Sequence, residues 1–196
     1  MTENPDGDVT ETLDSDVTEN PDDGKDTPGG NNTTLTHVDE SGRAQMVDVG
    51  SKVDSKRRAT AEGTITLRSG TVEAIRTDSV EKGDVLATAR IGAIQAVKHT
   101  WETIPMCHQI PITNVETDFE VGDEHITLQV TVETVGKTGC EMEALEGVTT
   151  GLNVLWDMVK AVEKDDEGQY PDTRIGDVRV AEKRVEPVDS ESSSGE

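Results

Sequence analysis

The sequence predicts an α+β domain of ferredoxin-like topology, in which an antiparallel sheet has helices on one face. Three observations predict it. Residues 113–121 and 126–135 have strand composition and are separated by a tight turn. Residues 83–101 and 140–163 repeat apolar side chains at the helical period. One more strand pattern precedes the first long helix and another follows the second, so the order is β-α-β-β-α-β.

The first strand and a short helix are adjacent in the chain. Residues 60–68 alternate, with Ile65 and Leu67 on one face, as in a strand with one buried face. Serine is a common helix cap, so we expect Ser69 to cap a short helix that ends at Arg76.

The first long helix has clear boundary signals. Gly83 and Asp84 precede it, it extends to about Trp101, and Pro105 prevents its continuation. Its alanines favour helix formation. Its expected apolar stripe, spaced by 3, 3 and 4 residues, is Ile91, Ile94, Val97 and Trp101.

The central hairpin is the clearest strand signal. In residues 126–135 apolar and polar side chains alternate strictly, and Gly122, Asp123 and Glu124 form the expected turn after residues 113–121.

The second long helix and the last strand complete the pattern. Residues 174–183 read as a strand with Ile175, Val178 and Val180 apolar. Residues 140–163 have a nearly ideal amphipathic period. Its stripe is Met142, Leu145, Val148, Leu152, Leu155, Val159 and Val162.

The charge distribution predicts one domain between two tails. The 196 residues include 18 Lys+Arg and 41 Asp+Glu, a net charge of −23. Residues 1–33 contain ten acids, one base and few apolar residues, which predicts a disordered N-terminal tail. Residues 185–196 contain four acids and no base, which predicts a second tail. The domain between them, residues 34–184, has a net charge of −10.

The composition excludes several classes of protein. An acidic surface repels phosphate backbones, and an aromatic content of 2% is too low for base stacking, so we expect no nucleic-acid partner. The sequence has no apolar run long enough to cross a membrane and no basic-then-apolar leader. Its two cysteines suggest no disulfide framework and suit the cytoplasm.

The predicted domain is acidic and has a modest core. Acidic residues throughout such a domain are typical of a surface adapted to a saline cytoplasm, where salt screens self-repulsion. A single sheet with few aromatic residues buries little apolar surface. We therefore expect self-association that covers the other face of the sheet.

Two lysines precede the predicted helices. Lys137 lies between glycines just before the second long helix, whose first backbone N–H groups favour an anion. The spacing is not that of a Walker loop, and, taken alone, the motif is more typical of a polar turn than of a phosphate site. Lys82 precedes the first long helix, where a solvated charge is the alternative interpretation.

Two further pairs of residues have both a functional and a structural interpretation. Asp157 and Lys160 are i,i+3 neighbours, which a surface ion pair explains. Cys107 and His108 suggest a thiol nucleophile or a metal, but the other cysteine and histidines lack zinc-ligand spacing, so we expect no metal. His108 also suits a hydrogen bond to a substrate.

Five segments together resemble the MoaC family, the cyclic pyranopterin monophosphate synthases of molybdenum cofactor biosynthesis. They span most of residues 35–183 and leave the tails uncovered. The segments are LTHVDESGRAQMVDVG (35–50), KGDVLATARIGAIQAVKHT (82–100), IPMCH (104–108), GKTGCEMEAL (136–145) and WDMVKAVEK (156–164).

The resemblance implies a ferredoxin-like lyase without a metal or organic cofactor. Its substrate would be 3′,8-cyclo-7,8-dihydro-GTP, which it would rearrange to cyclic pyranopterin monophosphate with release of pyrophosphate. It also implies a homohexamer, arranged as a trimer of dimers, with sites at subunit interfaces.

The resemblance also implies the site residues. Asp157 matches the acidic active-site residue, and Lys82 and Lys160 match the catalytic lysines. The matching substrate-binding and pocket-lining residues are Met106, Cys107, His108, Met142, Glu143, Glu141, Arg57 and Lys137.

Two departures from the family pattern leave other functions open. Gln109 stands where a proline usually follows Cys-His, and the glycine- and lysine-rich segment after the last strand is missing. The alternatives are a non-catalytic nucleotide- or anion-binding oligomeric module of the same fold, and a purely structural acidic protein. A module that only binds would not need Lys82, Asp157 and Lys160 as a set.

Overall fold

A computed structural model describes residues 43–188. The predicted tail at residues 1–33, and residues 189–196 of the second predicted tail, lie outside the described residues. The elements in chain order are β1 (Ser55–Thr66), α1 (Ser69–Arg76), α2 (Val85–Thr103), β2 (Ile112–Val121), β3 (His125–Gly136), α3 (Glu141–Glu163) and β4 (Arg174–Pro187).

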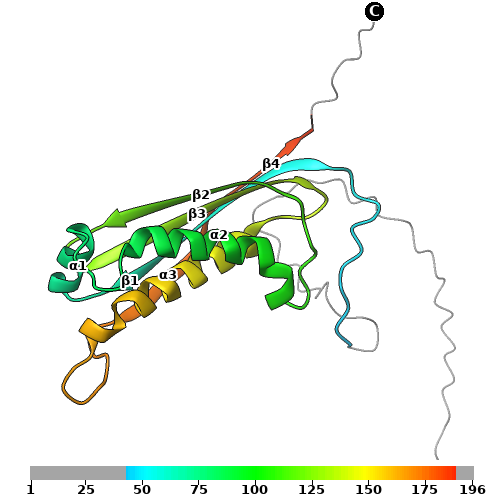
Figure 1. The fold of residues 1–196 in the computed structure, drawn as a ribbon. Helices are drawn as coiled ribbons and strands as arrows, with labels where there is room; N and C mark the ends of the chain where they lie inside the picture. The colour runs from blue at the N-terminus through cyan, green and yellow to red at the C-terminus, as the bar shows by residue number, and fades with distance from the viewer. Residues whose placement is uncertain (1–42, 189–196) are drawn as a thin grey trace, which may run out of the picture. The chain divides into compact units, whose positions relative to one another are not determined.

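The strands form one antiparallel sheet, and the long helices lie on one face of it. The strand order is β2-β3-β1-β4, so the hairpin of β2 and β3 lies beside β1. Figure 1 shows α2 and α3 side by side across the sheet. This arrangement confirms the predicted ferredoxin-like fold.

Strand pairing extends both β1 and β4 beyond their predicted ends. Ser55 pairs with Gly136 on β3 and with Pro187 on β4. Three consecutive basic residues, 56–58, hide the alternation at the start of β1. Because β4 is an edge strand whose residues are mostly exposed, its sequence shows little alternation at its end. Residues 185–187 therefore belong to the sheet and not to the predicted tail.

The cap of α1 differs from the prediction. The N-cap residue is Arg68, with an extended backbone, and Ser69 is the first helical residue. The Arg68 carbonyl accepts from the N–H groups of Thr71 and Val72. Arg68, two residues after the end of β1, therefore occupies the cap position without a side-chain cap, and the prediction that Ser69 is the cap was wrong.

The buried face of α2 consists largely of small residues that were not part of the predicted stripe. Ile91 is 66% exposed and Trp101 is 40% exposed, so these two assignments were wrong. The residues of the helix that are buried are Val85, Ala89, Ala93, Val97 and Thr100.

The close approach of α2 and α3 explains that face. A Cβ placed on Gly147 would lie 2.8 Å from Val97 Cγ2. A Cβ placed on Gly151 would lie 2.5 Å from Leu128 Cδ2 and 3.1 Å from Ala93 Cβ. Small residues on both helices let the two backbones approach, and a larger apolar side chain would not fit between them.

The predicted stripe of α3 is confirmed at its centre. Val148, Leu152, Leu155 and Val159 are buried in the core between helices and sheet. The ends of the stripe are wrong, because Met142 and Val162 are 41% and 58% exposed.

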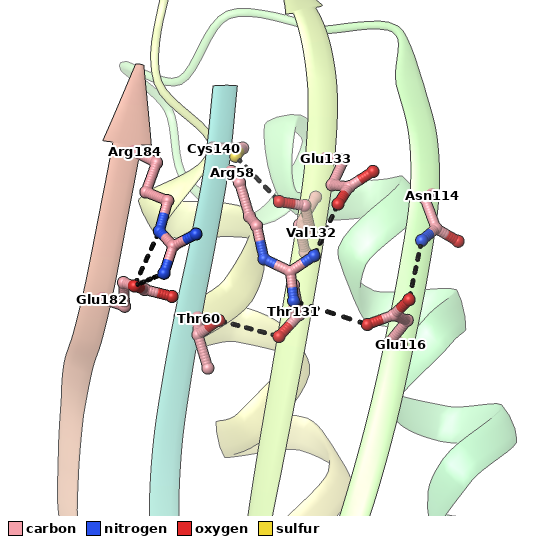
Figure 2. A network of polar contacts seen from close by, with 10 residues as sticks. All are labelled: Arg58, Thr60, Asn114, Glu116, Thr131, Val132, Glu133, Cys140, Glu182 and Arg184. Atoms are coloured by element: carbon pink, nitrogen blue, oxygen red, sulfur yellow. Dashed lines mark hydrogen bonds and ion pairs between the residues drawn. The ribbon is translucent and has the colours of Figure 1, made fainter. Parts of the chain in front are cut away.

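The opposite face of the sheet is polar. Arg58 on β1 pairs with Glu133 at 2.6 Å and lies 3.6 Å from Glu116 on β2. The hydroxyls of Thr60 and Thr131 lie 2.8 Å apart. Figure 2 shows these side chains joined across neighbouring strands. This face is therefore satisfied by hydrogen bonds and ion pairs and does not depend on apolar burial.

None of the helices within residues 43–188 is both long enough and apolar enough to cross a membrane.

Candidate functional site

A cleft of about 560 Å³ lies where the loop before α3, the start of α3 and the chain after α2 meet. It contains all eight substrate-binding and pocket-lining residues that the sequence predicted. The residues lining this cleft are Val47, Val49, Lys52, Arg57, Ile104, Met106, Cys107, His108, Lys137, Thr138, Gly139, Glu141, Met142, Glu143 and Lys183.

Hydrogen bonds to backbone carbonyls shape the rim of the cleft. Arg57 Nε donates to the Gly136 carbonyl at 3.3 Å, and its Nη2 donates to the Lys137 carbonyl at 3.4 Å. Lys137 Nζ donates to the Gly50 carbonyl at 2.7 Å. These bonds hold the loop before α3 against both β1 and the segment that precedes it.

Glu143 places a buried carboxyl group in the first turns of α3. Only 4% of the residue is exposed. Burial raises the pKa of Glu143 to about 7, the Glu141 charge adds to the rise, and its own backbone N–H opposes it. A carboxyl group with a pKa near neutrality can both accept and donate a proton, as a general acid or base must.

The thiols of Cys107 and Cys140 both have raised pKa values, whereas an activated nucleophile has a lowered one. Burial raises the pKa of Cys107, and Glu143 and Glu146 raise it further. Burial also raises the pKa of Cys140 to about 11, and its Sγ donates to the Val132 carbonyl at 3.3 Å. A reactive cysteine needs a lowered pKa, so this environment disfavours thiol catalysis.

Two cleft lysines were not among the predicted site residues. Lys183 Nζ on β4 lies 2.8 Å from Glu141 Oε1, and Lys52 lines the cleft from the segment before β1. Their positions depend on the β1–β4 pairing and on a segment without regular structure, which no local pattern indicates. With Arg57 and Lys137 they give the cleft four basic side chains against two acidic ones, although acids outnumber bases in the domain as a whole.

A second cluster lies at the other end of α3. Lys160 Nζ lies 2.6 Å from Asp157 Oδ1, and Lys82 Nζ lies 3.2 Å from Asp157 Oδ2. Lys82 also donates to the Asp157 backbone carbonyl. The three residues predicted as catalytic therefore meet in space, although Lys82 is distant in sequence from the other two.

The turn before α2 sets the position of Lys82. Gly83 has a φ of +97°, a left-handed conformation that L side chains rarely adopt. Asp84 then caps α2 by accepting from the Ala87 N–H at 2.9 Å. The sharp turn lets Lys82 reach α3 while α2 begins along the sheet.

The charges of the cluster stabilise one another. Hydrogen bonds from Lys160 and then Lys82 hold the pKa of Asp157 below its ordinary value. The Asp157 carboxylate raises the pKa of Lys160. All three side chains are well exposed, so the arrangement is open to a ligand and contributes little to stability.

The cleft and the cluster are separate within one chain. Glu143 and Asp157 are 14 positions apart on the same helix, a rise of about 21 Å. The two groups of residues therefore lie toward opposite ends of α3 in one subunit.

Comparison with known proteins identifies the family. The family model described as "MoaC family" matches residues 46–185. The chain belongs to the MoaC family. The match covers both the cleft and the Lys82–Asp157–Lys160 cluster, and it confirms the predicted resemblance.

Other MoaC proteins are highly similar over the same region. A relative from Natronomonas pharaonis, named "probable cyclic pyranopterin monophosphate synthase", is 71% identical over 149 residues, which are 76% of this chain and 93% of the relative. One of the same name from Halobacterium salinarum is 67% identical over 156 residues, 80% of this chain and 96% of the relative. A Methanothermobacter thermautotrophicus relative, named an "accessory protein" of that synthase, is 57% identical over 149 residues, 76% of this chain and 93% of the relative.

Proposed function

We propose that this MoaC chain is a cyclic pyranopterin monophosphate synthase that acts in molybdenum cofactor biosynthesis. It would convert 3′,8-cyclo-7,8-dihydro-GTP to cyclic pyranopterin monophosphate and pyrophosphate. The observation that supports this most strongly is that one cationic cleft contains every predicted substrate-binding residue. The names of the close relatives support the same activity.

The proposed products define what the site must do. Closing the cyclic phosphate forms a bond from a hydroxyl oxygen of the substrate to its α-phosphorus and breaks the bond to the β-phosphate. The hydroxyl proton must go to a base, and the departing pyrophosphate must be stabilised by cations.

The cleft residues suit those requirements. Lys52, Arg57, Lys137 and Lys183 can neutralise a triphosphate, and Arg57 offers a planar set of donors to phosphate oxygens. Glu143, ionised in part near pH 7, can accept a proton or bind a purine N–H edge. His108 lies in the same cleft as a further donor to phosphate.

We assign the remaining chemistry to Lys82, Asp157 and Lys160. Their ammonium groups can stabilise developing negative charge, and Asp157 fixes the two lysines relative to each other. Without such a role, three mutually oriented exposed side chains from two segments would contribute little to stability.

The distance between cleft and cluster leads us to propose a site shared between subunits. In a two-fold symmetric dimer, the cluster of one subunit could complete the cleft of the other. We propose a hexamer built as three such dimers, in agreement with the sequence expectation.

Mixing two inactive variants tests the shared site. Glu143→Ala damages the cleft and Lys160→Ala damages the cluster. After co-refolding, half of the random dimers are mixed, and each keeps one intact composite site. Activity should return to about one quarter of the wild-type value. If each site lies within one chain, the mixture would stay as inactive as either variant.

We place the reaction in the cytoplasm. Two cysteines without a disulfide framework and the acidic composition support that location. After lysis of the source cells and centrifugation, recovery of the native protein in the cytoplasmic supernatant would agree with this location. Recovery in the sedimented cell envelope would contradict it.

A non-catalytic binding module is the second candidate, and the accessory-protein name of one relative favours it. Both candidates predict binding of the cyclised GTP to the cleft. They separate when binding and pyrophosphate release are measured in the same sample in high salt. If wild-type protein binds the cyclised GTP tightly but releases no pyrophosphate, the non-catalytic binding module is supported.

A further inference from the structure

The loop between α3 and β4, residues 164–173, has a fixed path that returns it to the Lys82–Asp157–Lys160 cluster. Asp165 Oδ1 accepts from the N–H groups of Glu167 at 3.0 Å and Gln169 at 2.7 Å. The Asp165 N–H donates to the Gln169 carbonyl at 3.0 Å. Gly168 has a φ of +79° and closes the turn. These bonds fix the direction in which the chain leaves the turn at residue 170.

A buried carboxylate anchors the far end of the same loop. Glu163, the last residue of α3, is fully buried. It accepts from the Arg68 N–H at 3.2 Å and from the Thr173 hydroxyl. A buried carboxylate with two donors ties the end of α3 to the start of β4.

Between these two anchors, Tyr170 packs on the helix turn that bears the cluster. Its ring meets Trp156 edge-on, with centroids 5.6 Å apart and an interplanar angle of 88°. Trp156 immediately precedes Asp157 and lies one turn before Lys160, so positions 156 and 160 are neighbours on the helix surface. The contact therefore brings Tyr170 to the helix turn that bears Lys160, and the two side chains interact electrostatically.

We propose that Tyr170 is a positioning residue for Lys160 in the reaction that the cluster performs. The proposal rests on the proposed function, because it assumes that Lys160 contacts the substrate. In this proposal the loop of residues 164–173 serves to hold the phenol of Tyr170 near the ammonium group of Lys160.

The physical reason is the freedom of a lysine side chain. Lys160 is exposed, and an exposed long side chain samples many rotamers unless several neighbours restrict it. Asp157 restrains the ammonium group from the preceding helical turn. The proposal gives the second restraint to the hydroxyl of Tyr170, whose ring packs against Trp156. Both interactions raise the pKa of Lys160, with Asp157 the larger contributor, so Lys160 stays protonated.

The titratable groups around Lys160 come from three segments. Asp157 is on α3 itself, Lys82 comes from the turn before α2, and Tyr170 comes from the loop. Lys82 shares the Asp157 carboxylate. Removing the phenolic oxygen leaves Lys160 with only that shared carboxylate, which should lower its pKa.

Tyr170→Phe tests this because it keeps the ring on Trp156 and removes only the hydroxyl. The matched control is Asp172→Asn, which breaks an exposed ion pair in the same loop. Two quantities are measured on the full chain in high salt. One is the pH dependence of kcat and KM for pyrophosphate release. The other is the Lys160 pKa from ¹³C NMR of lysine-labelled protein, assigned by the signal lost in Lys160→Ala.

We expect Tyr170→Phe to lower kcat, by up to about 100-fold, because reacting groups tolerate little misplacement. KM should change less than kcat, the alkaline limb of the kcat profile should move to lower pH, and the Lys160 pKa should fall. Asp172→Asn should leave kcat, KM, the alkaline limb of the kcat profile and the Lys160 pKa unchanged. If either kcat or the Lys160 pKa in Tyr170→Phe matches wild type, the proposal is overturned. If wild-type protein releases no pyrophosphate, the proposed function fails, and the NMR measurement alone decides whether Tyr170 acts on Lys160.

Discussion

Lys160 Nζ lies 2.6 Å from Asp157 Oδ1, one helical turn away on α3, and this pair is completed by Lys82 from a separate segment. The helical spacing alone predicts only a surface ion pair. The third partner, placed by the turn at Gly83, distinguishes the cluster from such a pair.

The first prediction concerns this cluster. Lys160→Ala and Asp157→Ala should each reduce pyrophosphate release by at least about 100-fold, because an oriented charged group is lost from the reacting centre. Since the side chains are exposed, the urea midpoint of unfolding should stay close to that of wild type.

A similar ion pair elsewhere provides the control for these variants. Glu73 and Arg76 on α1 form an exposed i,i+3 pair at 2.7 Å, and neither is a predicted site residue. Glu73→Ala should leave both turnover and the urea midpoint unchanged. Full turnover in both cluster variants would refute the role assigned to Asp157 and Lys160.

The second prediction concerns the buried Glu143. Its folded-state pKa of about 7 lies above the ordinary value of 4.5, so the folded protein keeps the proton over a range in which the unfolded chain releases it. The contribution of Glu143 to stability should therefore be greatest below about pH 4.5 and should fall by roughly 3 kcal/mol as pH rises through about 7.

Glu143→Gln isolates that contribution. The amide cannot ionise, so the variant should lose this fall in stability and become more stable than wild type above pH 7, while its turnover decreases. Urea unfolding at a series of pH values measures the difference. Parallel stability curves for the two proteins would show that the Glu143 pKa is not raised by folding.

The third prediction concerns the packing of α2 on α3. Gly151→Ala places a Cβ 2.5 Å from Leu128 Cδ2 and 3.1 Å from Ala93, so it should destabilise the fold by about 1–3 kcal/mol. Gly70→Ala on α1 is the matched control, because a Cβ there meets no atom within 4 Å. It should be neutral or stabilise by up to about 1 kcal/mol. Equal free energies of unfolding in the two variants would contradict the proposed close approach of the helices.

How far the sequence predicts this fold depends on where side chains are buried. The period of α3 is visible because Val148, Leu152 and Leu155 are buried against the sheet. In α2 some large apolar residues mislead, since Ile91 is exposed while Ala89 and Ala93 are fully buried. An apolar residue indicates the buried face only when the neighbouring element leaves room for it.

The candidate site shows the same limit. The cleft residues near the start of α3 are close in sequence and could be grouped through the family resemblance. Lys183 reaches the cleft through the pairing of β4 with β1, and Lys52 through a segment without helix or strand. Such positions follow from long-range pairing, which local periodicity does not contain.

The fourth prediction concerns salt. The region 34–184 has a net charge of −10, and its self-repulsion is screened at molar salt but much less at about 0.1 M. Dialysis to about 0.1 M salt should reduce the helical circular dichroism signal, and returning the salt should restore it. An unchanged spectrum would show that the acidic composition is not an adaptation to salt.

The measurement that tests the central proposal most directly uses purified wild-type protein in high salt with 3′,8-cyclo-7,8-dihydro-GTP. Pyrophosphate and the pterin product, made fluorescent by oxidation, are quantified in the same reaction. A cyclic pyranopterin monophosphate synthase should produce the two in equal amounts over many turnovers, and Lys160→Ala should produce neither. Binding of the substrate by wild-type protein with neither product formed would contradict the proposed activity.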